Sequence, residues 1–154
     1  MRRYLVPFIT AASLAVSFIM VVSVTTEGRS RCSNGTLNGM YSLRATGDVL
    51  GVGPFAAAGV FSFDGSGHVT ATLVTRTNGN NGLSNVEGVY SVNADCFATD
   101  TLTSTTGAVS THEYAVFSRG KGFYILGTTS GAPNVIIGEA RKQHSETADS
   151  RDDQ

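Results

Sequence analysis

Apolar and polar residues alternate from Gly39 to Arg141, and Gly, Asn or Asp residues interrupt the alternation about every dozen residues. This pattern is typical of antiparallel strands joined by tight turns, because successive side chains of a strand point to opposite faces. No stretch in this part of the sequence has the periodicity of a helix, which excludes a helical or an α/β domain. The pattern predicts eight strands, over residues 39–46, 55–63, 68–76, 86–93, 98–105, 112–118, 123–129 and 135–140.

Eight short antiparallel strands must protect the hydrogen-bonding groups along their edges. A closed up-and-down barrel and a two-sheet β-sandwich both do so, and the short links between successive strands favour the barrel. One face of the expected strands is apolar, whereas the other carries hydroxyl groups such as those of Thr70, Thr72, Thr101 and Thr103. An outer-membrane barrel would instead present an apolar band to the lipid. We therefore expect an all-β, eight-stranded barrel surrounded by water.

Two connections between the expected strands carry clear turn signals. The segment from Asp64 to Gly67 has glycines that can adopt positive φ, so it is expected to be a hairpin turn. Residues 77–85 contain two Asn-Gly pairs and one large apolar residue, Leu83, and are expected to form an exposed loop.

The two ends of the chain differ in composition from the middle. Arg2 and Arg3 precede an uncharged run from Leu5 to Val24, which is the order of an export signal and is long enough to cross a bilayer. Residues 1–26 are expected to be a signal peptide or an uncleaved N-terminal membrane anchor, which is then the only membrane contact. The bulk of the chain is exported in either case, to the periplasm, the cell surface or the medium. Residues 141–154 are polar and are expected to be a disordered tail, which leaves 32–140 as the barrel domain.

The exported domain has two cysteines, Cys32 and Cys96. An even number of cysteines in an oxidising compartment favours a disulfide, and these two lack the spacing of a metal site or a redox motif. We expect a bond between them that ties the start of the domain to a distant turn.

Four sequence motifs follow one another in the order C…LxGxY…FxFDGxG…GxYxVxxDC. They are Cys32, Leu37–Tyr41, Phe61–Gly67 and Gly88–Cys96. Together they resemble a group of small exported bacterial all-β proteins. The strand plan is also similar to that of calycin (lipocalin-like) and allene-oxide-cyclase barrels, but the catalytic residues of those enzymes map onto no position of this chain. The resemblance therefore implies a fold and a compartment, and no activity.

His112 and Glu113 are adjacent ionisable residues in an expected strand and are the weak candidates for catalysis. If Glu113 faced the barrel interior, its carboxyl group could act as a general acid or base. The opposite register, with Tyr114 and Val116 inward and Glu113 in water, is preferred because unpaired carboxylates are rarely buried.

Other classes of site lack the residues that they need. His68, His112 and His144 have no ligand spacing and join no cluster of cysteines or carboxylates, so neither a metal nor a cofactor is expected. A formal charge of -1 argues against a nucleic-acid partner. The residues of a ligand site cannot be named from the sequence.

These observations favour a non-catalytic binding or cell-surface interaction module that takes a small apolar ligand or a cell-surface partner. The barrel mouth and the 77–85 loop are the expected sites, because rigid β-scaffolds usually place function there. A second hypothesis is a small barrel enzyme, similar to a cyclase or isomerase, with a lumenal acid–base residue such as Glu113. A third is a structural envelope protein, which a solidly packed interior without an exposed apolar patch would favour.

Overall fold

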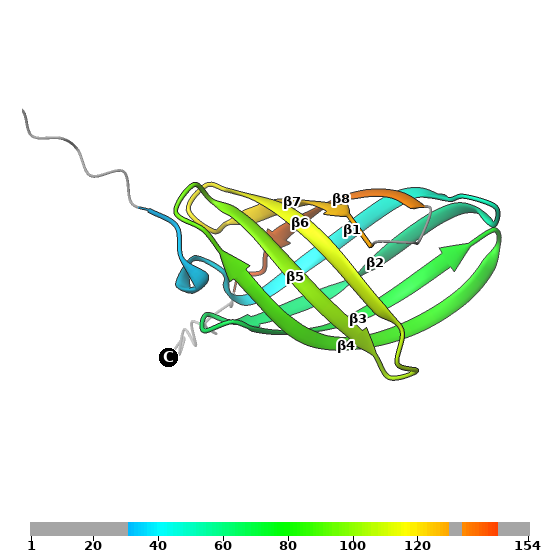
Figure 1. Ribbon diagram of the computed structural model, residues 1–154, viewed down its shortest axis with the longest axis horizontal. Helices are drawn as coiled ribbons and strands as arrows, with labels where there is room; N and C mark the ends of the chain where they lie inside the picture. Colours follow the sequence, from blue (N-terminus) through cyan, green and yellow to red (C-terminus); the bar gives the residue numbers. More distant parts are fainter. Residues whose placement is uncertain (1–30, 130–133, 145–154) are drawn as a thin grey trace, which may run out of the picture.

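The computed structural model describes residues 31–129 and 134–144. These residues form a short 3-10 helix followed by eight strands (Figure 1). The elements are η1 (Asn34–Thr36), β1 (Asn38–Val49), β2 (Gly53–Asp64), β3 (His68–Thr77), β4 (Asn80–Val92), β5 (Phe97–Ser104), β6 (Val109–Phe117), β7 (Gly122–Gly127) and β8 (Asn134–Lys142).

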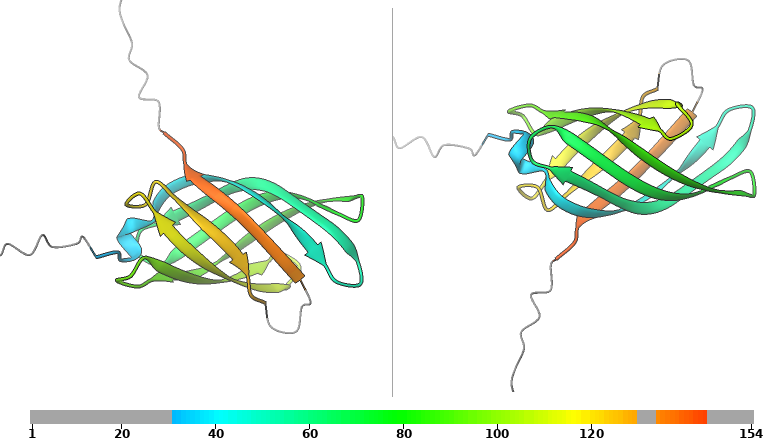
Figure 2. Two further views of the ribbon diagram at one scale, coloured as in Figure 1. Left: turned by 90° about the horizontal axis from the view of Figure 1, so that it is seen from above. Right: turned by 90° about the horizontal axis from the view of Figure 1, so that it is seen from below.

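The eight strands close into one antiparallel up-and-down barrel. Each strand pairs with the next along the chain, and β8 pairs with β1, for example through Leu43 and Ala140. The strands run obliquely around the barrel, as the two views of Figure 2 show. The predicted fold class is confirmed, and the sandwich alternative is wrong. Because the barrel is closed, no described strand has a free edge that could pair with another chain.

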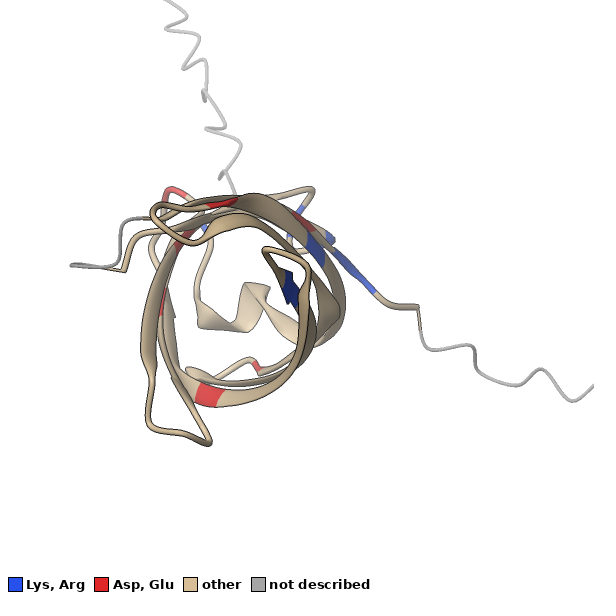
Figure 3. Ribbon diagram, turned by 90° about the vertical axis from the view of Figure 1, so that its right-hand side faces the viewer, with Lys and Arg blue, Asp and Glu red and all other residues tan. Residues whose placement is uncertain are grey.

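One end of the barrel is sealed and is called the closed end here. Figure 3 looks along the barrel from the opposite, open end and shows η1 crossing the far side. Leu37, directly after η1, is completely buried. Tyr90 donates a hydrogen bond to the Leu37 carbonyl oxygen at 2.9 Å, and Tyr41 donates one to the Gly120 carbonyl oxygen at 2.7 Å. These two hydroxyl groups attach η1 and the β6–β7 turn to the inside of the barrel.

A disulfide between Cys32 and Cys96 adds a covalent link at the closed end. It joins Cys32, two residues before η1, to the β4–β5 turn, 64 positions later in the sequence. The predicted pairing is confirmed.

Aromatic side chains fill the closed half of the barrel. They point inward from β1, β2, β4, β6 and β7 and are Tyr41, Phe61, Phe63, Tyr90, Tyr114 and Phe123. The ring centroids of Phe63 and Tyr90 are 4.9 Å apart in an edge-to-face arrangement, and those of Tyr114 and Phe123 are 4.7 Å apart and stacked. Such pairs are favourable beyond the area that they bury. An eight-stranded barrel is just wide enough for side chains to fill it in this way.

Glycines at inward positions let the strands bend around this narrow core. A Cβ atom on Gly59 would lie 2.1 Å from the Thr72 carbonyl oxygen, and one on Gly88 would lie 1.9 Å from the Thr101 carbonyl oxygen. Neighbouring backbones therefore approach more closely at these points than any side chain allows. Such glycine kinks are how small barrels achieve their curvature.

The prediction of an exposed loop over residues 77–85 is wrong. β3 and β4 form one long hairpin in which Thr77 pairs with Asn80, and only Asn78 and Gly79 form the turn. Both turn residues have positive φ, 46° and 84°, as a two-residue hairpin turn of this handedness requires. The second Asn-Gly pair, Asn81-Gly82, lies within β4, where the main chain is paired despite its polar side chains.

The expected signal or anchor segment, residues 1–26, lies outside the described residues, and so does the expected tail from residue 145 onward. At the C-terminal boundary, β8 continues through Lys142, two residues beyond the predicted end of the domain. The described part of the chain contains no helix with the length and apolar character needed to span a membrane.

Candidate functional site

The open end of the barrel exposes part of its interior to solvent. At the closed end the inward side chains are buried, whereas those toward the open end are half-buried. Glycines aside, the half-buried inward residues of the open end are Val49, Phe55, Leu73, Thr75, Thr77, Ser84, Val86, Ser104, Ser110, His112, Asn134 and Ile136. They combine apolar groups with hydroxyl groups and one amide, and His112 is the one titratable side chain among them.

Asp100 is the one buried charged residue of the described chain. It faces inward from β5, and strand pairing places it directly opposite His112 on β6. Its Oδ1 atom lies 2.7 Å from His112 Nδ1, and its Oδ2 atom accepts a hydrogen bond from the Tyr114 hydroxyl group. His112 and Tyr114 can both reach it because they are two residues apart on β6 and share its inner face.

The two partners explain how a carboxylate is tolerated in this position. Burial, followed by the nearby Asp100 charge and the hydrogen bond to it, raises the pKa of Tyr114 well above its ordinary value. The phenol thus stays protonated and donates to Asp100. A buried carboxylate without donors would be costly, whereas one that accepts from both a hydroxyl group and an imidazole N–H is largely compensated.

The two candidates predicted from the sequence lie on opposite sides of the barrel wall. Tyr114 is inward and Glu113 is exposed on the outside, as the preferred register predicted. Glu113 therefore does not reach the interior and is not the lumenal acid–base residue of the enzyme hypothesis. His112 is inward, with 18% of its side chain exposed.

Sequence reasoning missed Asp100. A signal was present, because Asp100 lies between Ala98 and Leu102 on the apolar face of its expected strand. A carboxylate at such a position indicates either an error of register or a buried polar pair.

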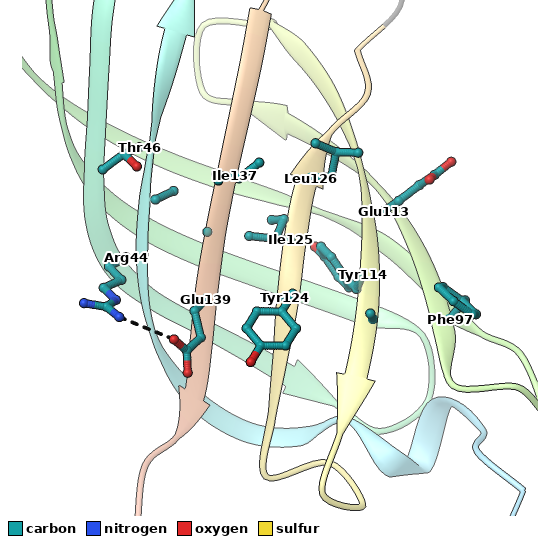
Figure 4. A pocket seen from close by; sticks show the side chains of 13 residues that line it. Arg44, Thr46, Phe97, Glu113, Tyr114, Tyr124, Ile125, Leu126, Ile137 and Glu139 are labelled. Atoms are coloured by element: carbon teal, nitrogen blue, oxygen red, sulfur yellow. Dashed lines mark hydrogen bonds and ion pairs between the residues drawn. The ribbon is translucent and has the colours of Figure 1, made fainter.

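A concave feature lies on the outside of the barrel, over β1 and β5–β8 (Figure 4). This outer groove has a volume of about 660 Å³ and is open to solvent. It is lined by Arg44, Ala45, Thr46, Phe97, Glu113, Tyr114, Ala115, Tyr124, Ile125, Leu126, Ile137, Gly138 and Glu139. Phe97, Tyr124 and Ile137 are more than half exposed, so the condition set for a purely structural protein, no exposed apolar patch, is not met.

Two arginines share one carboxylate at one side of the outer groove. Glu139 accepts hydrogen bonds from Arg141 at 2.7 Å and from Arg44 at 3.4 Å. The hydrogen bond from Arg141, together with Arg44, holds the pKa of Glu139 below its ordinary value. The three groups keep an excess of one positive charge, and exposed pairs of this kind are weak.

Within residues 31–129 and 134–144, no group of three or more His, Cys, Asp or Glu side chains is arranged to hold a metal ion. His68 is exposed at the start of β3 and His144 is exposed after β8. Asp100 and His112 thus form a pair without a third ligand.

The sequence matches no known protein family and no curated protein. Solved structures with a similar fold include designed barrels. One is a de novo designed fluorescence-activating β-barrel, with a TM-score of 0.52 and 14% sequence identity over 70% of this chain and 94% of that chain. A redesigned β-barrel, mFAP1, bound to DFHBI, has a TM-score of 0.53 and 16% identity over 71% and 97%. The structure of EF1p2_mFAP2b bound to DFHBI has a TM-score of 0.54 and 11% identity over 70% and 94%. At these identities the similarity shows the fold alone.

Proposed function

We propose that this protein is an exported binding module that holds a small apolar ligand at the open end of its barrel. The observation that carries the proposal is the difference between the two ends. Aromatic rings and η1 seal one end, whereas apolar and hydroxyl-bearing side chains are accessible at the other. Ligand sites are typically concave and mainly apolar, with a few polar groups that orient the ligand.

Two further observations support this function. The mouth of a small β-barrel is a common place for one small ligand, and two of the solved structures with a similar fold are described as bound to DFHBI. Export is supported by the apolar run from Leu5 to Val24 and by the disulfide, because disulfides persist in oxidising compartments. Mass spectrometry of the mature protein tests export, since cleavage near residue 26 or an intact anchor in the membrane fraction is expected.

The ligand site can be tested with two fluorescent probes, Nile red and DFHBI, and three variants. Ser110→Trp adds bulk at an inward, half-buried position of the open end. Ile137→Arg places a charge in the outer groove. Thr101→Trp is the matched control, because Thr101 is exposed on the outside of β5 and lines neither site.

We expect at least one probe to bind the wild-type protein and to raise its melting temperature, because a ligand that binds only the folded state stabilises it. Ser110→Trp should weaken that binding by about tenfold or more, equivalent to about 1.4 kcal/mol, while Ile137→Arg and Thr101→Trp leave it unchanged. Loss of binding in Ile137→Arg alone would move the site to the outer groove. Failure of both probes to bind the folded wild-type protein would contradict the proposed function.

A further inference from the structure

The Asp100–His112–Tyr114 cluster is a directed chain of hydrogen bonds that ends at the open side of the barrel. The Asp100 carboxylate is 4% exposed and accepts from both neighbours. Since Tyr114 is a fixed donor to Oδ2, the remaining oxygen, Oδ1, accepts the N–H of His112 Nδ1. A neutral imidazole that carries its proton on Nδ1 has a lone pair on Nε2. In the neutral imidazole, the Asp100 carboxylate therefore selects the tautomer whose second nitrogen is a hydrogen-bond acceptor.

This second nitrogen is accessible. Nε2 has no hydrogen-bond partner among the described residues, and no buried side-chain nitrogen or oxygen in that part of the chain lacks a partner. Nε2 must therefore be in contact with solvent, consistent with the 18% exposure of the side chain. His112 lies between Tyr114 and Ser110 on the inner face of β6, and Ser110 is closer to the open end.

The position beside His112 has little side-chain bulk. Its partner on β7 is Gly127. A Cβ atom on Gly127 would meet Asn134 at 3.4 Å and Ile136 at 3.5 Å, which are ordinary van der Waals contacts, so the site tolerates an added group. A ligand that enters from the open end can thus approach the imidazole from this side.

We infer that the ligand carries a hydroxyl group on an apolar frame and donates this hydroxyl to His112 Nε2. The inference rests on the proposed function and adds the chemical class of the ligand. A ligand that covers Nε2 removes it from water, so a ligand without a donor leaves this acceptor unsatisfied at the full desolvation penalty. An anionic ligand would instead face a lone pair backed by the Asp100 carboxylate. The half-buried inward residues around His112 supply apolar groups, hydroxyl groups and the Asn134 amide, so they offer no charge to pair with an ionic ligand.

The test compares two probes that differ in this one group, 2-naphthol and 2-methoxynaphthalene, at about pH 8, where the naphthol is protonated and a free imidazole is neutral. The wild-type protein should bind 2-naphthol about tenfold more tightly than 2-methoxynaphthalene, because the methyl ether has no proton to donate. His112→Phe should make the two affinities equal. His68→Gln is the matched control, since His68 is exposed at the start of β3, and it should retain the preference. Gly127→Val should weaken the binding of both probes.

A measurement on the wild-type protein avoids any effect of the variants on folding. The ¹⁵N chemical shift of His112 Nε2 should change when 2-naphthol is added and remain unchanged with 2-methoxynaphthalene. Equal binding of the two probes by the wild-type protein, with no change at Nε2, would overturn the inference and leave the proposed function intact. Failure of both probes to bind, together with the failure of Nile red and DFHBI, would refute the proposed function itself.

Discussion

At the scale of single residues, the buried hydrogen bond between Tyr114 and Asp100 is expected to stabilise the fold. Tyr114→Phe removes the donor and leaves a carboxylate oxygen unsatisfied in the interior. Loss of one partner of a buried polar pair costs about 1–3 kcal/mol. Urea denaturation should show this loss, whereas Tyr124→Phe, which removes an exposed hydroxyl group, should have almost no effect. Equal stabilities of the two variants would show that this hydrogen bond contributes nothing.

Asp64 makes the stability of the β2–β3 turn dependent on pH. The Ser66 hydroxyl and backbone amide, with the amides of His68 and Gly67, donate to its carboxylate and lower its pKa below the ordinary value of 3.8. A folded-state pKa below the unfolded one gives stability that is present above the unfolded value and lost as the pH falls toward the folded value.

The unfolding free energy of the wild-type protein should therefore decrease below about pH 4. Asp64→Asn keeps an acceptor oxygen but cannot titrate, so it should lack this part of the decrease. Denaturation curves between about pH 2 and pH 7 measure the difference. Parallel acid dependence in the two proteins would contradict this account of the turn.

The site was only partly predictable at this scale. The sequence correctly placed Tyr114 inward and Glu113 outward, because an unpaired carboxylate is rarely buried. It could not pair Asp100 with His112, since that contact depends on the exact register across the turn between β5 and β6. A shift of one residue in that register would move His112 to the other face.

At the scale of elements, the β3–β4 turn depends on a backbone conformation that few residues adopt. Gly79 has a φ of 84° and no atom within 4 Å of the position that a Cβ would occupy. Gly79→Ala should thus lose about 1 kcal/mol of unfolding free energy for conformational reasons alone. Asn78→Gly, at the neighbouring position, removes a similar strain and should be neutral or slightly stabilising. Thermal or urea denaturation distinguishes the two, and a stable Gly79→Ala variant would rule out this turn type.

The strands and most of their turns were predictable because each strand buries one face in the barrel, which imposes the two-residue alternation. The prediction failed at residues 80–85, where Ser84 is half-buried and the other five residues are exposed. No apolar face is needed there, so the sequence resembles a loop although the main chain is paired with β3. The two Asn-Gly pairs, Asn78-Gly79 and Asn81-Gly82, are equivalent turn signals in the sequence. Only the pairing of β3 with β4 selects Asn78-Gly79 as the turn.

At the scale of the whole molecule, the Cys32–Cys96 disulfide is expected to be a large source of stability. The cysteines are 64 residues apart in sequence. Closing a loop of this length in the unfolded chain gives a stabilisation of about 4 kcal/mol in the chain-entropy model. The double variant Cys32→Ser, Cys96→Ser should lose about this amount in urea denaturation, and a reducing agent should affect the wild-type protein in the same direction. A loss well below about 1 kcal/mol would indicate that the reduced unfolded chain is already compact.

The uneven distribution of the core also predicts how the barrel opens. The buried aromatic rings and the disulfide lie in the closed half, while the tip of the β3–β4 hairpin buries almost no apolar surface. Local opening is least costly where few apolar contacts are lost. Amide hydrogen exchange should therefore be fast for residues 80–85 and slow for Tyr41, Phe61 and Phe123, whose amides should exchange only through global unfolding.

Removal of the disulfide separates these two modes of exchange. A loss of about 4 kcal/mol in global stability should accelerate exchange in the aromatic core about a thousandfold. Exchange at residues 80–85 should hardly change, because opening of the hairpin tip does not break the contacts at the closed end. The same acceleration at both places would mean that the barrel opens as a single cooperative unit. The open end could then not adjust to a ligand while the closed end stays folded.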